Sequence, residues 1–163
     1  MTDTTTIGYW TQYQTRGDDS LDTAVDATLG DSADNYDLGG LAVAWHQAIN
    51  AALPDGVSLI NGREFYGPAD PQERSWAGDL DIAAVIESVD LWALAPDYEL
   101  WSRDRIAQEI GIQPRSVRSW IARHKVQRAD WDDASGRPMA QYRAGDIKTA
   151  QAAAHGQGAR TDL

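Results

Sequence analysis

The sequence contains no cysteine, which excludes disulfide bonds, thiolate metal sites and thiol catalysis. No run approaches the roughly 18 consecutive apolar residues of a membrane-spanning helix. The opening stretch MTDTTTIGYW has neither the basic start nor the apolar run of a signal peptide. We therefore expect a cytoplasmic protein with no membrane association.

Enzyme motifs are also missing: there is no P-loop, no G-x-G-x-x-G fingerprint and no nucleophile motif. His46 and Glu64 are candidates for an acid–base pair. Glu64 is also a candidate, with Asp79 and Asp81, for a divalent-metal site. Nothing in the spacing fixes the geometry of either set, and an acidic solvated surface is the simpler interpretation. We expect a non-enzymatic protein with no catalytic residue, no metal and no cofactor.

Basic residues are scarce in the first hundred positions. Arg16, Arg63 and Arg74 stand there against 18 Asp and Glu, which gives −15, whereas residues 101–163 carry 11 basic and seven acidic residues, which gives +4. The two parts together account for the net charge of −11 of the 163-residue chain. The charge of each part is the relevant quantity for a nucleic-acid partner, and the second part is compatible with one.

The first part predicts an acidic arm followed by a small domain. Residues 1–35 are rich in Thr, Asp, Gly and Ser, which favours a flexible acidic arm with one marginal helix over Ser20–Leu29. Asp37 is a candidate N-cap for a helix whose apolar stripe recurs every fourth residue, at Leu41, Trp45, Ile49 and Leu53.

A hairpin and a second helix are expected next. Asn61-Gly62 predicts a type I′ turn in a hairpin over Val57–Tyr66. A loop then leads to a helix that Asp81 begins, and Pro96 ends that region. Residues 36–98 therefore form an expected α-β-β-α domain, an acidic α+β unit for dimerisation or a protein partner. Its tryptophans are core or interface residues: Trp45, Trp76 and Trp92.

The second part predicts two short helices joined by a glycine turn. Ser102 is a candidate N-cap, Gly111 ends the first helix, and Pro114 suits the first turn of the next. The spacing of the second helix gives one buried face: Val117, Trp120, Ile121 and His124. The later elements are expected as strands over Val126–Arg128 and Met139–Tyr142, a turn-rich DWDDASGRP loop, a helix from Ile147 to about Ala154 capped by Asp146, and a frayed tail over residues 155–163.

A helix pair of this kind places the outer face of its second helix in the DNA major groove. No acid occurs between Arg115 and Arg128, and arginine binds guanine bidentately or a phosphate. The alternative interpretation is a solvated helix face. The candidate DNA-binding residues are Gln113, Arg115, Ser116, Arg118, Ser119, Arg123, Lys125, Arg128 and Arg137.

The stretch LWSRDRIAQEIGIQPRSVRSWIARHKV, followed by GRPMAQYRAGDIKTAQ, resembles the winged helix-turn-helix of the MerR and excisionase-like superfamily. The resemblance covers about residues 100–154 and implies DNA binding through the helix 114–124, with a wing against the backbone or minor groove. It places Arg118 early in the recognition helix and Arg137 in the wing. The chain departs from MerR regulators in its acidic wing loop, and only nine residues follow Ala154.

We expect an α+β fold in which an α-β-β-α domain precedes a winged helix-turn-helix domain over residues 99–154. The expected function is sequence-specific binding of double-stranded DNA in transcription regulation. Two alternatives stay open: an excisionase-like architectural factor of a phage or mobile element, and an acidic protein-interaction or DNA-mimic inhibitor module.

Overall fold

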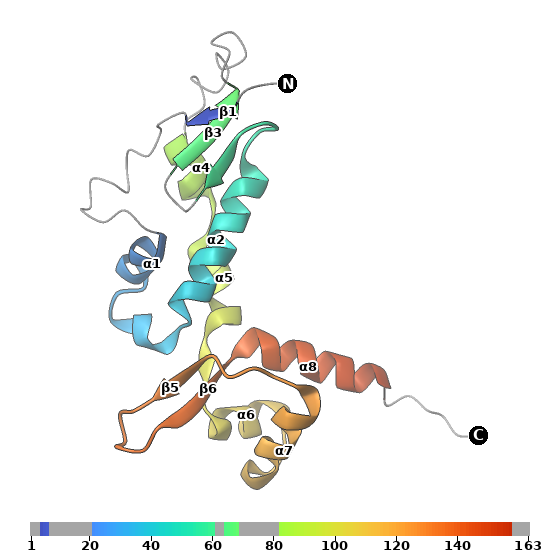
Figure 1. Ribbon diagram of the computed structural model, residues 1–163. Coiled ribbons are helices and arrows are strands. Elements are labelled where there is room, and N and C mark those ends of the chain that lie inside the picture. The colour runs from blue at the N-terminus through green and yellow to red at the C-terminus, as the bar shows by residue number, and fades with distance from the viewer. Residues whose placement is uncertain (1–3, 7–20, 61–63, 69–81, 158–163) are drawn as a thin grey trace. The chain divides into compact units, whose positions relative to one another are not determined.

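The computed structural model describes residues 4–6, 21–60, 64–68 and 82–157 (Figure 1). The chain divides into two compact units, the first from residues 1–33 and 38–94 and the second from residues 34–37 and 95–163. Each unit contains helices and a small antiparallel sheet, so the predicted α+β class is confirmed. Among the described residues, no helix is long and apolar enough to cross a membrane.

The first unit combines a three-stranded antiparallel sheet of order β1-β3-β2 with short helices. Its strands are β1 (Thr4–Thr6), β2 (Ser58–Ile60) and β3 (Glu64–Pro68). Its helical elements are α1 (Leu21–Leu29), the start of η2 (Gly30–Asn35), α2 (Leu38–Ala52), α4 (Ile82–Ser88) and the start of α5 (Leu91–Tyr98).

Apolar stripes explain how the helices α1 and α2 pack in this unit. The stripe predicted for α2 is confirmed, because Leu41, Trp45, Ile49 and Leu53 are all buried. The marginal helix predicted over Ser20–Leu29 is present as α1, and its apolar face is buried at Leu21, Ala24, Val25 and Leu29. Residues 21–29 are therefore packed in this unit, whereas the sequence predicted a flexible arm.

The predicted hairpin is present as β2 and β3, which pair antiparallel from Ser58↔Tyr66 to Ile60↔Glu64. Its Asn61-Gly62 turn lies outside the described residues, as do Trp76, Asp79 and the Asp81 cap. The third strand was not predicted: β1 pairs antiparallel with β3, with Thr6 opposite Tyr66.

The prediction that Pro96 ends its helical region is wrong, because Pro96 lies inside α5 and the helix continues to Tyr98. The break comes earlier, between α4 and α5, where Asp90 Oδ1 accepts a hydrogen bond from the Ala93 N–H at 3.3 Å. Because proline has no backbone N–H, α5 lacks the hydrogen bond from residue 96 to the Trp92 carbonyl.

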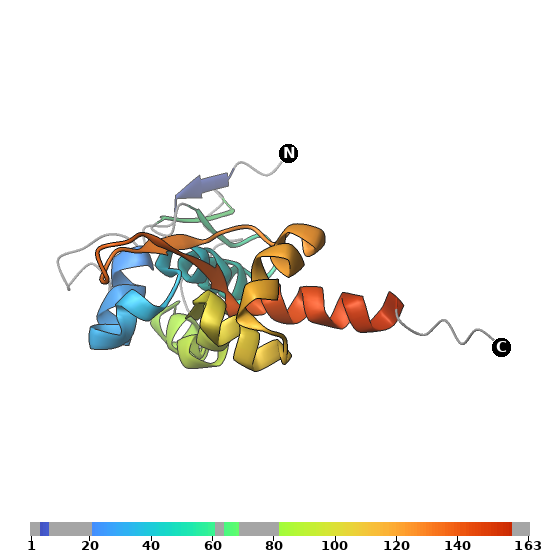
Figure 2. The ribbon, with the colours of Figure 1, turned by 90° about the horizontal axis from the view of Figure 1, so that it is seen from below.

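The second unit packs three helices against a three-stranded antiparallel sheet of order β4-β6-β5 (Figure 1). Its elements are β4 (Leu100–Trp101), α6 (Arg103–Ile110), α7 (Pro114–His124), β5 (Asp130–Asp132), β6 (Met139–Arg143) and α8 (Ala144–Gln157). Ile106, Val117 and Ile147 are fully buried and join α6, α7 and α8 in one core. The far half of α8 extends beyond the helix pair (Figure 2).

Backbone hydrogen bonds connect the C-terminal end of α5 to Asp37 and to the start of α8. The Asp37 N–H donates to the Tyr98 carbonyl at 2.9 Å, and the Ala144 N–H donates to the Glu99 carbonyl at 2.8 Å. Arg143 Nε lies 2.6 Å from Asp37 Oδ2 and forms an ion pair with it. The angles at this contact do not meet the criteria for a hydrogen bond. These contacts fix where the strand β6 passes into α8.

Two boundaries in the second unit differ from the predictions. Val126–Arg128 is not a strand, because the Val126 N–H still bonds back to the Ile121 carbonyl at the end of α7, and the first strand of the hairpin begins at Asp130. The helix α8 begins at Ala144 rather than Ile147, so Asp146 lies in its first turn, and it runs to Gln157. Residues 155–157 are therefore helical, whereas the sequence predicted a frayed tail.

Candidate nucleic-acid interface

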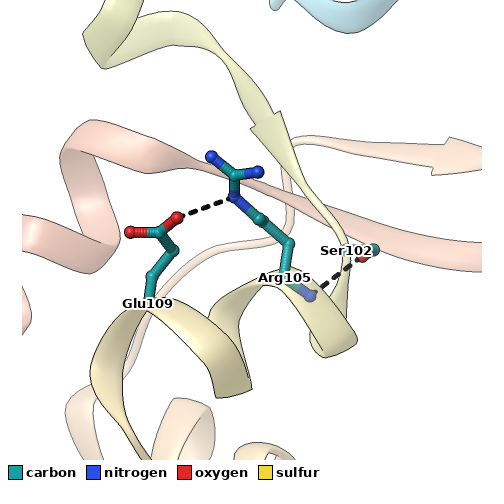
Figure 3. A network of polar contacts seen from close by, with 3 residues as sticks. All are labelled: Ser102, Arg105 and Glu109. Carbon is teal, nitrogen blue, oxygen red and sulfur yellow. Dashed lines mark hydrogen bonds and ion pairs between the residues drawn. The ribbon is translucent and has the colours of Figure 1, made fainter.

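The first helix of the candidate interface, α6, begins and ends at the predicted residues. The Ser102 hydroxyl accepts a hydrogen bond from the Arg105 N–H at 3.2 Å, which satisfies a free donor of the first turn (Figure 3). Gly111 ends the helix in the left-handed conformation, with φ 73° and ψ 36°, and its N–H bonds to the Ala107 carbonyl. Arg105 and Glu109 form an ion pair at 2.9 Å along the exposed side of α6 (Figure 3).

The second helix, α7, begins where proline is tolerated best. Pro114 occupies the first turn, where its missing N–H would have had no intrahelical partner. Gln113 holds the N-cap position without a side-chain capping bond, so its exposed amide is not used in capping. At the other end, Lys125 adopts a left-handed conformation with φ 54°, and among the described residues it is the one non-glycine with positive φ. Such a conformation strains a lysine.

The two faces of α7 differ in chemistry. Val117 and Ile121 are buried against the core, and Trp120 and His124 are partly buried beside them with ring centroids 4.5 Å apart. At 100° per residue the opposite face carries the predicted polar set, and all of it is exposed: Arg115, Ser116, Arg118, Ser119 and Arg123. The predicted division of this helix into a core face and a basic outer face is confirmed.

Four of the predicted residues come together around one open hollow of about 480 Å³ on α7. Arg115 and Arg123 supply two guanidinium groups, Ser116 and Ser119 supply two hydroxyls, and Ile112 and Trp120 supply apolar walls. Arg118 lies on the other flank of the helix and does not line the hollow. This side of α7 therefore offers cationic donors and hydroxyls, which suit a phosphate or a base edge.

Some described basic residues of the second unit are ion-paired, whereas others, which include the arginines of α7, have no ion pair: Arg103, Arg115, Arg118, Arg123, Lys125, Arg128 and Arg137. Arg105, Arg143 and Lys148 each lie within ion-pair distance of a carboxylate, of Glu109, Asp37 and Asp97 respectively. Within the described part of the chain, Arg115, Arg118 and Arg123 have no ion-pair partner. Three unpaired guanidinium groups on one exposed helix form a surface suited to a polyanion.

The hairpin β5–β6 adds a site that sequence reasoning missed. The Arg128 guanidinium lies 4.2 Å from the ring centroid of Trp131, a cation–π contact, and Trp131 is 47% exposed. An aromatic three positions after an arginine was the only signal in the sequence, and a turn-rich loop was expected there. Arg137 is exposed in the connection between the strands, beside Gly136 with φ 76°.

Two of the acidic side chains in this hairpin are engaged locally. Asp130 Oδ1 accepts from the Trp131 N–H at 2.7 Å, and Asp132 Oδ1 accepts from the Ala134 N–H at 2.9 Å. Asp130 therefore bonds the next residue of its own strand, and Asp132 bonds the backbone of the turn that follows β5. The negative charge remains, and it lies on the hairpin that contains Arg137 and that Arg128 precedes.

Of the candidate enzyme residues, His46 is the one whose side chain the structure describes. The His46 ring nitrogen Nε2 lies 2.7 Å from the Leu59 carbonyl oxygen, and Asn50 makes two further hydrogen bonds with the Leu59 backbone. His46 thus holds β2 against α2. The side chains of Glu64, Asp79 and Asp81 lie outside the described residues, and the described ones contain no cluster of His, Asp and Glu that could hold a metal.

Comparison of the chain with protein-family models, with curated proteins and with solved structures found no match in any of the three.

Proposed function

We propose that this protein binds double-stranded DNA sequence-specifically and acts as a transcriptional regulator. In this proposal the second unit is a winged helix-turn-helix: α6 braces α7, α7 enters the major groove, and β5–β6 form the wing. The observation that carries it is the exposed face of α7, where Arg115, Arg118 and Arg123 lack ion-pair partners among the described residues. The major groove admits one α-helix, and arginine is the commonest side chain to read guanine there.

The arrangement around α7 supports this role. The turn at Gly111 is short and capped, so the orientation of α7 against α6 is set by backbone hydrogen bonds and by the buried Ile106 and Val117. A rigidly held helix is what sequence readout needs, because bidentate contacts tolerate little misplacement. In this proposal Arg128, two residues before β5, and Arg137, between β5 and β6, contact the phosphate backbone beside the helix.

The test uses the full chain with duplex DNA. Sequences selected from a random duplex pool define the preferred site, and fluorescence anisotropy then measures the dissociation constant over a range of salt concentrations. We expect the double variant Arg115→Ala/Arg118→Ala to lose roughly 2–6 kcal/mol of binding free energy if both contacts are bidentate. For each arginine that contacts a phosphate instead, the slope of log K against log salt falls by about 0.9.

A matched control removes the same charge from outside the proposed interface. Arg105→Ala/Lys148→Ala also deletes two cations, both of which are ion-paired in the structure. This variant should keep its sequence preference and most of its affinity. Equal losses in the two double variants would show that net charge, and not the face of α7, governs binding. Unchanged affinity and preference in Arg115→Ala/Arg118→Ala would sink the proposal.

A further inference from the structure

The first unit has a hollow of about 480 Å³ between α1, α2 and the α4–α5 connection, lined in part by exposed aromatic surface. Its floor is apolar and buried: Trp45, Ile86 and Leu91. At its edge Trp92 is 52% exposed, although the ring is large and apolar. An exposed tryptophan beside an apolar floor is the composition of a protein-binding hot spot. We call this hollow the Trp92 groove.

The charged side chains that the structure describes around the Trp92 groove are all acidic. Glu87 and Asp90 line it and are exposed. Throughout the described part of the first unit there is no lysine or arginine, while the acids there include Asp22, Asp26 and Asp55. A cationic partner meets attraction from every ionised group that the structure describes in this unit, and such complementarity selects partners and speeds their association.

We propose that the Trp92 groove binds a cationic segment of a partner protein. The segment places an apolar side chain on the floor formed by Trp45, Ile86 and Leu91, against the ring of Trp92, and sets lysine or arginine beside Glu87 and Asp90. An amphipathic basic helix has this pattern of anchors and charges. The inference concerns a different unit from the proposed DNA interface and does not depend on it.

The chemistry of the groove argues against the other occupants. A second copy docked groove to groove would bring Glu87 and Asp90 against their own counterparts, and like charges placed across an interface disfavour the complex. A nucleic acid would meet the same repulsion. A basic segment removes this repulsion and covers the exposed Trp92 ring at the same time.

The experiment pans a library of random displayed peptides against the full-length protein and then measures one selected synthetic peptide by fluorescence anisotropy. We expect the selected peptides to combine lysine or arginine with leucine or an aromatic residue. Trp92→Ala should weaken binding by roughly tenfold or more, as for a hot-spot residue. Glu87→Gln should weaken it about two- to fivefold and reduce its dependence on salt.

The control variant is Val43→Ala, since Val43 is 55% exposed in α2 of the same unit and does not line the groove. It should bind the peptide as the parent protein does. The proposal is overturned if no peptide is selected, if the selected peptides are acidic, or if Trp92→Ala binds them unchanged. It is also overturned if Trp92→Ala abolishes a dimer seen by light scattering, because a second copy would then fill the groove. A rise in the affinity of Trp92→Ala for duplex DNA would overturn it as well, because the chain's own arginines would then fill the groove.

Discussion

Gly111 forms the turn between α6 and α7, and the direction in which its replacement by alanine changes the free energy of unfolding can be predicted. The residue has φ 73° and ψ 36°. Its own N–H and that of Ile112 both bond to the Ala107 carbonyl, at 3.0 Å and 3.1 Å. A Cβ added at Gly111 would meet nothing within 4 Å. The substitution Gly111→Ala is therefore a test of backbone conformation with no steric clash.

Two opposing contributions set the magnitude. A non-glycine residue in the left-handed region costs about 1–2 kcal/mol. Alanine also restricts the unfolded chain, which stabilises by about 0.4–1 kcal/mol where the native backbone suits it. The conformational penalty is larger, so we expect Gly111→Ala to lower the free energy of unfolding by about 1 kcal/mol. Gly111→Asn should lose less, because asparagine tolerates this conformation.

The assay is urea denaturation followed by the methyl signals of Ile106, which is buried in the second unit, so that unfolding of the first unit does not enter the measurement. Gly136→Ala is the control, since Gly136 has φ 76° and equally open surroundings in the hairpin. It should show a similar loss without affecting the α6–α7 turn. If Gly111→Ala were neutral or stabilising, or if Gly111→Asn were as destabilising as alanine, the left-handed turn would be refuted.

Three further variants test the second unit. Val117→Ala, at a fully buried position, should cost about 2 kcal/mol in urea denaturation with an unchanged m value; a loss below about 0.5 kcal/mol would contradict its place in the core. Gly145→Ala should lower the thermal midpoint despite the better helix propensity of alanine, because the new Cβ would lie 2.9 Å from the Asp97 carbonyl oxygen; a raised midpoint would disprove that close approach. Lys125→Gly should raise stability by about 1 kcal/mol by removing the left-handed strain, and weaken duplex binding in anisotropy titrations; unchanged affinity would remove Lys125 from the interface.

The features that could be predicted from the sequence are those that a few neighbouring residues decide. Ser102, Gly111 and Pro114 each act within one helical turn, so the ends of α6 and the start of α7 followed from local rules. The burial of Val117 and the exposure of Arg115 followed from helical periodicity in the same way. The exposed basic face of α7 could therefore be predicted from the sequence.

Features set by distant pairing could not be predicted in this way. The strand β1 forms because Thr4–Thr6 pairs with Tyr66–Pro68, and three threonines carry no signal of that partner. The strand β5 begins at Asp130, where aspartates disfavour a strand, because the Ala129 N–H bonds to the Gln141 carbonyl at 2.9 Å and the register continues from there.

The uneven charge of the chain has a consequence for the proposed DNA binding that its net value conceals. Charges separated by more than about 8 Å are largely screened at physiological salt. In the proposed complex the α7 arginines would act on DNA mainly at contact, and the negative charge of the first unit would weaken loose association, most of all at low salt. Arginine contacts at base edges survive this opposition better than diffuse attraction to phosphates does. If the protein binds DNA as proposed, this charge distribution would lower its non-specific affinity more than its specific affinity, and the ratio of the two decides which sites are occupied in a cell.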